Sequence, residues 1–157
     1  MSDTSTFGVT VQQESDYVFR IQFDETAIAD LMTDEPAPLG GGNGPNPSRL
    51  LVAAVANCMS ASLLFALRKY KNQPGPITTK AVATMGRNAS GRQRVERIDT
   101  HIQLAERAGD HQHIERILAQ FEDFCVVTES VRHGVEVAIK VSDADGVLLH
   151  GGDAVPA

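Results

Sequence analysis

The feature that most constrains the fold is a long stretch without a charged residue, which runs from Leu50 to Leu67. Asn46 and Pro47 precede it and are typical of a helix start, because an asparagine side chain caps the first turn and proline has no N–H that needs a partner there. Arg68 and two lysines follow, where positive charge favours a helix C-terminus. The stretch therefore predicts one central helix over residues 47–71.

Apolar residues occupy every side of this predicted helix, which indicates that it is buried on all sides. At about 1.5 Å per residue it would span roughly 35 Å, the width of a small domain. A membrane span is the alternative, since it needs about 20 mostly apolar residues. Asn57, Ser60 and Ser62 interrupt the stretch, and many of its other residues are weakly apolar alanines. We therefore expect a helix in a soluble core and no membrane contact.

The composition fits one soluble domain that binds no nucleic acid. The chain has 157 residues, of which 42% are hydrophobic, and a formal net charge of −6. It is long enough to bury a core as a single domain over residues 1–157. A nucleic-acid-binding surface concentrates positive charge, whereas this chain has one small basic cluster. We interpret that cluster as the solvated face of a hairpin; it consists of Arg87, Arg92, Arg94 and Arg97.

The remaining sequence predicts antiparallel strands on both sides of the central helix. N-terminal strands are expected over 7–32 (a hairpin of Phe7–Gln12 and Tyr17–Phe23, then a short strand or helical turn over 27–32), followed by a glycine- and proline-rich loop over 34–46. Strands and helices are expected over 77–141 (a hairpin of 77–87 and 95–105, a helix over 111–124 capped by Asp110, a helical turn over 126–132 and a strand over 135–141), followed by a tail over 142–157.

This order predicts an α+β fold, with antiparallel sheets packed around a long buried helix. Short hairpins from one chain provide too little surface to enclose such a helix. We therefore expect a second copy of the chain to cover the rest, as a homodimer. The loop before the helix lacks the spacing of a P-loop or a dinucleotide-binding turn, and Arg49 is the only cation near it, so phosphate binding is the weaker interpretation.

Two cysteines, Cys58 and Cys125, form the only group of residues suited to redox chemistry. No signal peptide is recognisable, which favours reduced thiols in the cytoplasm over a disulfide scaffold. Cys58 lies within the central helix, where an inert, packed thiol is the common outcome. Cys125 falls between two helical segments, where N–H groups can lower a thiol pKa. Zinc binding is a third alternative, to which His111 and His113 add little because residues two apart do not share a helical face.

Two short motifs resemble those of a known family. The central helix carries Pro45-Asn46-Pro47-x-x-Leu50-Leu51-x-x-Ala54-x-x-x-Cys58, and the second motif reads Cys125-x-Val127-x-x-Ser130. With their separation and the order of elements, they resemble the OsmC/Ohr family of osmotically inducible and organic hydroperoxide resistance proteins, over roughly residues 9–141. The resemblance implies an intertwined homodimer with active sites at the subunit interface.

The resemblance also implies a reaction, the reduction of hydroperoxides by a cysteine pair. Cys58 would attack a small hydrophobic hydroperoxide as a thiolate and become a sulfenic acid, and Cys125 would condense with it to a disulfide that an external dithiol reduces. This scheme uses no cofactor. The family's arginine beside the reactive sulfur corresponds best to Arg20 on the second predicted strand.

The sequence departs from the family pattern at two positions. Ser48 stands where the family's peroxidases carry a glutamate that holds the arginine, and Val126 stands where a proline usually follows the second cysteine. Asp34 or Glu35 could anchor the arginine instead, or Arg49 could be the cation. We therefore expect a peroxidase weaker than typical members. The alternatives are a non-enzymatic dimer that binds a small apolar ligand and one that senses oxidation through its thiols.

Overall fold

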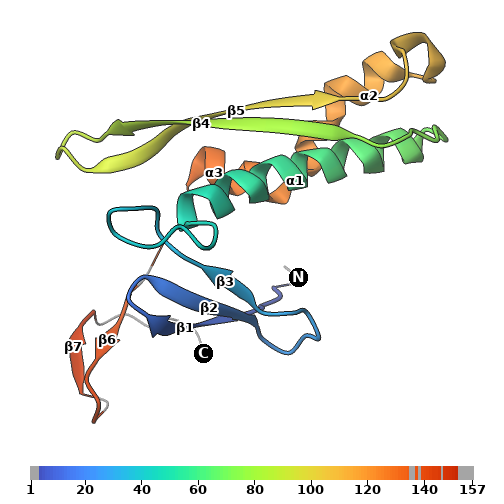
Figure 1. Ribbon diagram of the computed structural model, residues 1–157. Coiled ribbons are helices and arrows are strands. Elements are labelled where there is room, and N and C mark those ends of the chain that lie inside the picture. Colours follow the sequence, from blue (N-terminus) through green and yellow to red (C-terminus); the bar gives the residue numbers. More distant parts are fainter. Residues whose placement is uncertain (1–3, 135–136, 138, 146, 152–157) are drawn as a thin grey trace.

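The longest element of the computed structural model is α1 (Pro47–Lys69), and the other elements are arranged along it (Figure 1). The structure describes residues 4–134, 137, 139–145 and 147–151. As the sequence predicts, Asn46 is the N-cap of α1 and accepts a hydrogen bond from the Arg49 N–H. By length and composition alone, α1 is the one helix in the described part of the chain that could cross a membrane, and core helices of soluble proteins share that property.

The N-terminal sheet is antiparallel, in the order β1-β2-β3, and is formed by β1 (Val9–Ser15), β2 (Val18–Phe23) and β3 (Leu31–Thr33). The first hairpin turns at Asp16, whose φ is 44°. The sequence left a short strand or a helical turn open for residues 27–32, and the structure has the strand β3 at the end of this segment. In Figure 1 this sheet lies beyond the loop at the start of α1, well separated from the second sheet. Every residue of β1 is exposed in the single chain.

A long antiparallel hairpin of β4 (Thr78–Arg87) and β5 (Gln93–Gln103) runs along α1 (Figure 1). Half-buried and exposed side chains alternate along most of β4. This is the pattern of an antiparallel sheet with one covered face. The hydroxyl groups of Ser60 in α1 and Thr79 in β4 are hydrogen-bonded, so a polar contact fixes the hairpin against the middle of the helix.

Four short helical segments follow the hairpin: η1 (Ala108–Asp110), α2 (Ile114–Gln120), η2 (Phe121–Phe124) and α3 (Val126–His133). α3 agrees with the predicted helical turn, and Gly134 follows it with a φ of 75°, a conformation that glycine adopts readily. The N-terminus of α3 packs against the middle of α1, where it positions Cys125.

The prediction of one helix over 111–124 capped by Asp110 is wrong. The Asp110 carboxylate accepts a hydrogen bond from a backbone N–H in the preceding turn. His113 is the N-cap of α2 and has a left-handed backbone, with a φ of 58°. His111 is buried and lies beside Glu106, so the chain turns inward before the helix begins. The spacing of apolar residues carries no signal for a buried histidine, which is why the sequence placed the start too early.

The C-terminal strands also differ from the prediction. β6 (Val141–Ser142) and β7 (Leu148–His150) form a separate antiparallel pair that, apart from Val141, lies within the tail expected over 142–157. The Asp143 carboxylate accepts hydrogen bonds from the N–H groups of Asp145 and Val147, and this local turn joins the strands. Of the strand predicted over 135–141, residues 135, 136 and 138 lie outside the described part, and Val141 alone of the others is in a strand.

The hydrophobic core lies against the C-terminal half of α1. Its fully buried centre consists of Leu63, Ala66, Leu67 and Ile117, around which Tyr70, Ile77, Ile102, Leu104, Ile114 and Phe121 are packed. These residues come from α1, the hairpin and its flanking segments, and the first helices after it. The arrangement confirms the α+β class, with antiparallel sheets and one long helix.

The single chain does not bury α1 on every side, which corrects the expectation drawn from its apolar faces. β4, β5, α2, η2 and α3 pack against the helix. A stripe of exposed residues at helical spacing remains and consists of Ala54, Asn57, Ala61, Phe65 and Arg68. Phe65 is 56% exposed. This stripe, called the open face below, is the surface that the predicted homodimer would cover.

Candidate active site

The two cysteines lie together between α1 and α3. Cys58 is in the middle of α1 and is half-buried, whereas Cys125 is the N-cap of α3 and is 0% exposed. Both are free thiols, and the Cys58 thiol is within hydrogen-bonding reach of the Cys125 sulfur. The structure thus brings together two of the three predicted site residues. Their chemical roles stay predictions.

Backbone N–H groups at the N-terminal end of α3 influence the pKa values of both thiols. The N–H groups of Val127 and Val126 act to lower the pKa of Cys58, and the N–H of Thr128 acts to lower the pKa of Cys125. The first N–H groups of a helix have no partner inside it, and they favour a negative charge nearby. The sequence predicted such surroundings for Cys125. The structure extends them to Cys58.

Two buried hydroxyl groups face Cys125. Its Sγ lies 2.9 Å from Oγ1 of Thr128, and the Ser62 hydroxyl approaches it from α1. Thr128 and Ser62 are 5% and 6% exposed, so both hydroxyls are held in the protein interior. The sequence analysis missed Thr128. The signal that could have found it is the step of three residues from the N-cap, because side chains at these two helix positions meet.

These contacts shift the pKa values of the two thiols in opposite directions. Burial raises the pKa of Cys125, but hydrogen bonds from Thr128, Cys58 and Ser62 outweigh it and hold that pKa below its ordinary value. Burial and the contact with Cys125 raise the pKa of Cys58, although the N–H groups of α3 act in the opposite direction. In the single chain, therefore, the first negative charge of the pair resides on Cys125 and the proton stays on Cys58.

A cation that the sequence analysis did not single out acts on Cys125. The guanidinium of Arg132, on α3, binds Glu122 and lies 3.7 Å from Glu129. Its hydrogen bond with Glu122, and to a lesser degree the charges of Glu129 and Cys125, raise the Arg132 pKa, so this side chain is always positively charged. Its attraction for a negative charge on Cys125 is a minor effect, since Glu122 and Glu129 balance most of the Arg132 charge.

Arg20, the third predicted site residue, lies in the N-terminal sheet. Its guanidinium is 2.6 Å from Glu14 and 3.4 Å from Asp30, and hydrogen bonds with these carboxylates raise its pKa. Among the described residues, no hydrogen bond or ion pair joins Arg20 to either cysteine. The single chain does not bring Arg20 to the thiols.

Arg49, the alternative cation, cannot reach Cys58 within one chain. It precedes Cys58 by two and a half helical turns, which puts it about 13 Å away along the axis and on the opposite side of α1. Arg49 and Ser48 instead line a separate cavity of about 680 Å³ between the start of α1 and β4.

The two acidic residues considered as anchors stabilise the loop before α1. Asp34 is 2% exposed, and its Oδ2 accepts hydrogen bonds from the N–H groups of Asn43 and Gly41, which hold the Asp34 pKa below its usual value. Glu35 accepts a hydrogen bond from the Asn46 side chain, the cap of α1. Both carboxylates therefore fix the entry to the helix.

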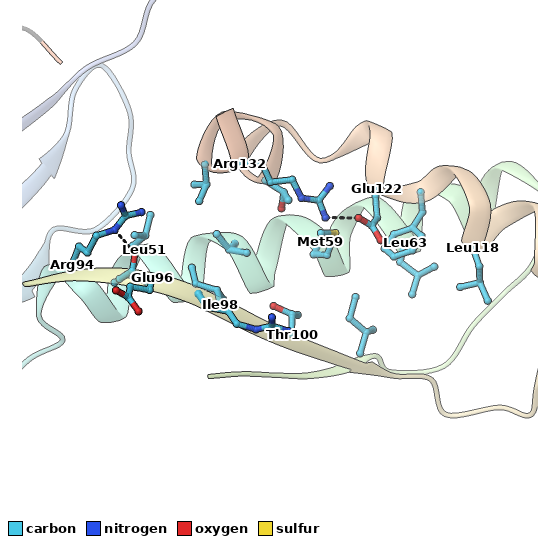
Figure 2. Close-up of a pocket in the computed structure, with 17 residues that line it drawn as sticks. Leu51, Met59, Leu63, Arg94, Glu96, Ile98, Thr100, Leu118, Glu122 and Arg132 are labelled. Carbon is cyan, nitrogen blue, oxygen red and sulfur yellow. Dashed lines mark hydrogen bonds and ion pairs between the residues drawn. The ribbon is translucent and has the colours of Figure 1, made fainter. Parts of the chain in front are cut away.

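A cavity of about 650 Å³ lies between α1, β5 and α3 (Figure 2); neither cysteine lines it. Figure 2 shows the side chains that line it, among them Leu51, Met59 and Leu63 from α1, Arg94, Glu96, Ile98 and Thr100 from β5, and Leu118, Glu122 and Arg132 from the helical segments. Thr128 also lines it, so the cavity reaches a side chain that contacts Cys125. Arg94 and Arg97 of the basic cluster border the cavity while staying exposed.

The histidines do not assemble a metal site. His111 lies 3.6 Å from Glu106, and His113 packs its ring against Tyr70, so the two face different partners. No group of three or more His, Cys, Asp or Glu side chains in the described part of the chain is placed to hold a metal ion.

Comparison with known proteins agrees with this fold. A family model described as OsmC-like protein matches residues 40–140. Similar solved structures include an organic hydroperoxide resistance protein from Elizabethkingia anophelis with crystallant-derived thiocyanate bound (19% identity, TM-score 0.66, 87% of this chain and 95% of that chain covered). Others are an organic hydroperoxide resistance protein from Legionella pneumophila (15%, 0.62, 85% and 93%) and an OsmC-like protein of unknown function from Vibrio cholerae (17%, 0.67, 81% and 94%).

Identities this low show a shared fold alone. No curated protein matches the sequence at a significant level.

Proposed function

The chain belongs to the family of OsmC-like proteins, and we propose that it is a thiol peroxidase that reduces organic hydroperoxides. The observation that carries the proposal is the cysteine pair, whose two sulfurs meet at the N-terminal end of α3 with Cys58 the more exposed of the two. The organic hydroperoxide resistance proteins among the similar structures support it.

In the proposed reaction, Cys58 is the attacking sulfur. Its thiolate attacks the outer oxygen of the hydroperoxide, the O–O bond breaks, and the alkoxide takes a proton and leaves as an alcohol. Cys58 is then a sulfenic acid. Cys125 attacks the oxidised sulfur, a disulfide forms, and water leaves. An external dithiol in the cytoplasm reduces the disulfide and is itself oxidised, so no cofactor takes part.

The first step requires a thiolate at Cys58, whereas the single chain keeps the proton there. A cation beside Cys58 reverses this order, because an opposite charge favours the ionised form of a thiol. We propose that the active protein is a homodimer in which a second copy covers the open face of α1 and its Arg20 approaches Cys58. Glu14 and Asp30 already bind Arg20. These two carboxylates partly replace the glutamate that the family's peroxidases carry where this chain has Ser48.

The substrate class follows from the cavity between α1, β5 and α3. Aliphatic side chains of α1 form one wall, and charged side chains of β5 and α3 lie at its edges. Such a cavity suits a small hydrophobic hydroperoxide better than hydrogen peroxide, which offers no apolar surface to bind.

A second candidate function is a dimer that binds a small apolar ligand in the same cavity, or that senses oxidation without turnover. The raised pKa of Cys58 favours this candidate, since a protonated thiol is a poor nucleophile. Peroxide turnover separates the two candidates.

The deciding experiment measures dithiol-dependent consumption of tert-butyl hydroperoxide by the full chain. The proposal expects turnover by wild type, none by Cys58→Ser, and a single turnover ending in a sulfenic acid for Cys125→Ser. Ser48→Glu should accelerate turnover, because a carboxylate at residue 48 would hold an arginine in two hydrogen bonds. If wild type and Cys58→Ser are folded but equally inert, the enzyme interpretation fails and the ligand-binding one replaces it.

A further inference from the structure

The geometry points to Thr128 as a catalytic residue of the regeneration step, which makes Cys125 the sulfur that leaves when the dithiol attacks the disulfide at Cys58. This inference rests on the proposed function, because it concerns the disulfide that the function requires. It goes further by fixing which sulfur is attacked and which groups decide this.

The first argument is access. Cys125, the N-cap of α3, is 0% exposed because its own chain covers it completely, whereas the same chain leaves Cys58 half-buried. A thiolate from solvent must approach the attacked sulfur along the S–S bond, from the side opposite the leaving sulfur. The covered sulfur is therefore the one that leaves, and the accessible sulfur receives the new bond.

The second argument is the set of groups that receives the leaving sulfur. Thr128 Oγ1 lies 2.9 Å from Cys125 Sγ. The thiol donates this hydrogen bond when it is protonated, and the hydroxyl donates it when the sulfur carries a negative charge. The Ser62 hydroxyl and the Thr128 N–H act on the same sulfur and also favour its negative charge. Groups already in place for a developing charge lower a barrier without rearranging.

The balanced step is a thiol–disulfide exchange. The dithiol's thiolate forms a bond to Cys58 Sγ, the Cys58–Cys125 bond breaks, and its electron pair leaves on Cys125 as a thiolate. The dithiol's second thiolate then attacks its own sulfur in the mixed disulfide, which releases Cys58 and oxidises the dithiol to a cyclic disulfide. Two electrons pass from the dithiol to the protein, and its two protons end on the cysteine pair or in solvent. A leaving thiol of lower pKa leaves faster, which is the property that Thr128 confers.

The first test identifies the attacked sulfur. The disulfide is made with diamide, treated with one equivalent of 2-mercaptoethanol in the full chain, quenched with iodoacetamide and mapped by mass spectrometry. We expect the mercaptoethanol adduct on Cys58 and the alkyl group on Cys125. The reverse assignment overturns the inference.

The second test measures the contribution of Thr128. Thr128→Val removes the hydroxyl and keeps the branched shape, and Thr128→Ser restores the hydroxyl. We expect Thr128→Val to slow reduction of the preformed disulfide by dithiothreitol about three- to tenfold and Thr128→Ser to recover most of the rate. In a Cys58→Ser background, Thr128→Val should also shift the pH profile of Cys125 alkylation to higher pH. Ser130→Ala is the matched control, because the Ser130 hydroxyl, also on α3, donates to the Val126 carbonyl.

Equal rates and equal pH profiles for wild type and Thr128→Val overturn the inference. If Thr128→Val does not fold, Ser62→Ala provides the same comparison from α1. Diamide makes the disulfide without peroxide, so these results stand apart from the proposed function. Loss of peroxide turnover with the expected adduct on Cys58 refutes the peroxidase and leaves the assignment of the leaving sulfur intact.

Discussion

The two halves of α1 are buried to different extents, although their sequences look alike and the open face runs along both. In the C-terminal half, Leu67 is 0% exposed and is surrounded by the hairpin, α2 and η2. In the N-terminal half, Leu51 is 38% exposed, and the alanines that follow it at 53 and 54 face outward. Cys58 lies between the halves.

The difference teaches that the chain supplies a rigid support for the thiols and leaves the other side of them open. The packed half fixes Cys58 relative to the hairpin and α3. The open face, which runs along both halves, and the exposed residues of β1 hold the apolar surface that one chain cannot cover. Among the described residues of the packed side, no cation influences the Cys58 pKa appreciably, so we expect the cation that the proposed reaction needs to come with whatever covers the open side. The predictions below test this contrast, from the largest expected effect to the smallest.

The sharpest comparison uses the same substitution in both halves. Leu67→Ala should lower the free energy of unfolding by about 2–5 kcal/mol, because it leaves a cavity in a fully packed region. Leu51→Ala should cost less than about 1.5 kcal/mol at low protein concentration, since part of its side chain is already in water. Urea denaturation measures both values. If both substitutions lowered the free energy of unfolding equally at every protein concentration, the two halves of α1 would be equally packed in solution.

A charge on the open face should separate two copies without unfolding either. Sedimentation of wild type at micromolar concentration should give a species of twice the 16.9 kDa chain mass. Ala54→Glu should weaken this dimer by at least roughly tenfold, because a carboxylate would be buried at the interface without a partner. Ala89→Glu, in the exposed turn of the hairpin, is the control and should leave the dimer intact. A well-folded wild-type monomer would contradict the prediction.

The loop before α1 should depend on pH through Asp34. Its pKa is lowered in the folded chain, so its contribution to stability is complete above the unfolded carboxyl pKa of about 3.9 and is lost as the pH falls through the lower folded pKa. Asp34→Asn should therefore lower the Tm most at neutral pH, and the difference from wild type should vanish at acidic pH. Calorimetry between pH 7 and 3 measures this. If the Tm difference between wild type and Asp34→Asn grew as the pH fell, the pKa of Asp34 would be raised, not lowered, on folding.

The smallest effect concerns the start of the exposed half. Asn46→Ala removes the cap of α1 and should lower the free energy of unfolding by about 1 kcal/mol. Asn46→Ser keeps a capping oxygen and should recover most of this loss. If the two variants are equally destabilised, the contact between the Asn46 side chain and Glu35 matters more than the cap.

Much of the fold could be predicted because the deciding signals are local. The start of α1 follows from Asn46 and Pro47, and the strands follow from alternation between apolar and polar residues. The failures occur where burial decides. His111 packs inward and moves the start of α2, and exposure of half of α1 depends on how far neighbouring elements extend, which no local pattern records.

The candidate site divides in the same way. The nearness of Cys58 and Cys125 could be expected from their motifs, and the structure shows it. Thr128 was missed although its step of three residues from Cys125 is a local signal, and Arg132 was missed because its ion pair with Glu122 depends on how α3 packs against η2. Arg20 stays a prediction, since a chain on its own contains no information about which side chains a second copy brings.

The shared end of α3 has a consequence for stoichiometry. Different N–H groups at the same helix end act on the two sulfurs, and a negative charge on Cys125 disfavours a second charge on Cys58. The two thiols of the single chain should therefore ionise in separate steps, with Cys58 the later one. One equivalent of an alkylating reagent per chain should consume the fast-reacting thiol and leave the other slow. A chain with two cysteines should therefore show only one fast-reacting thiol.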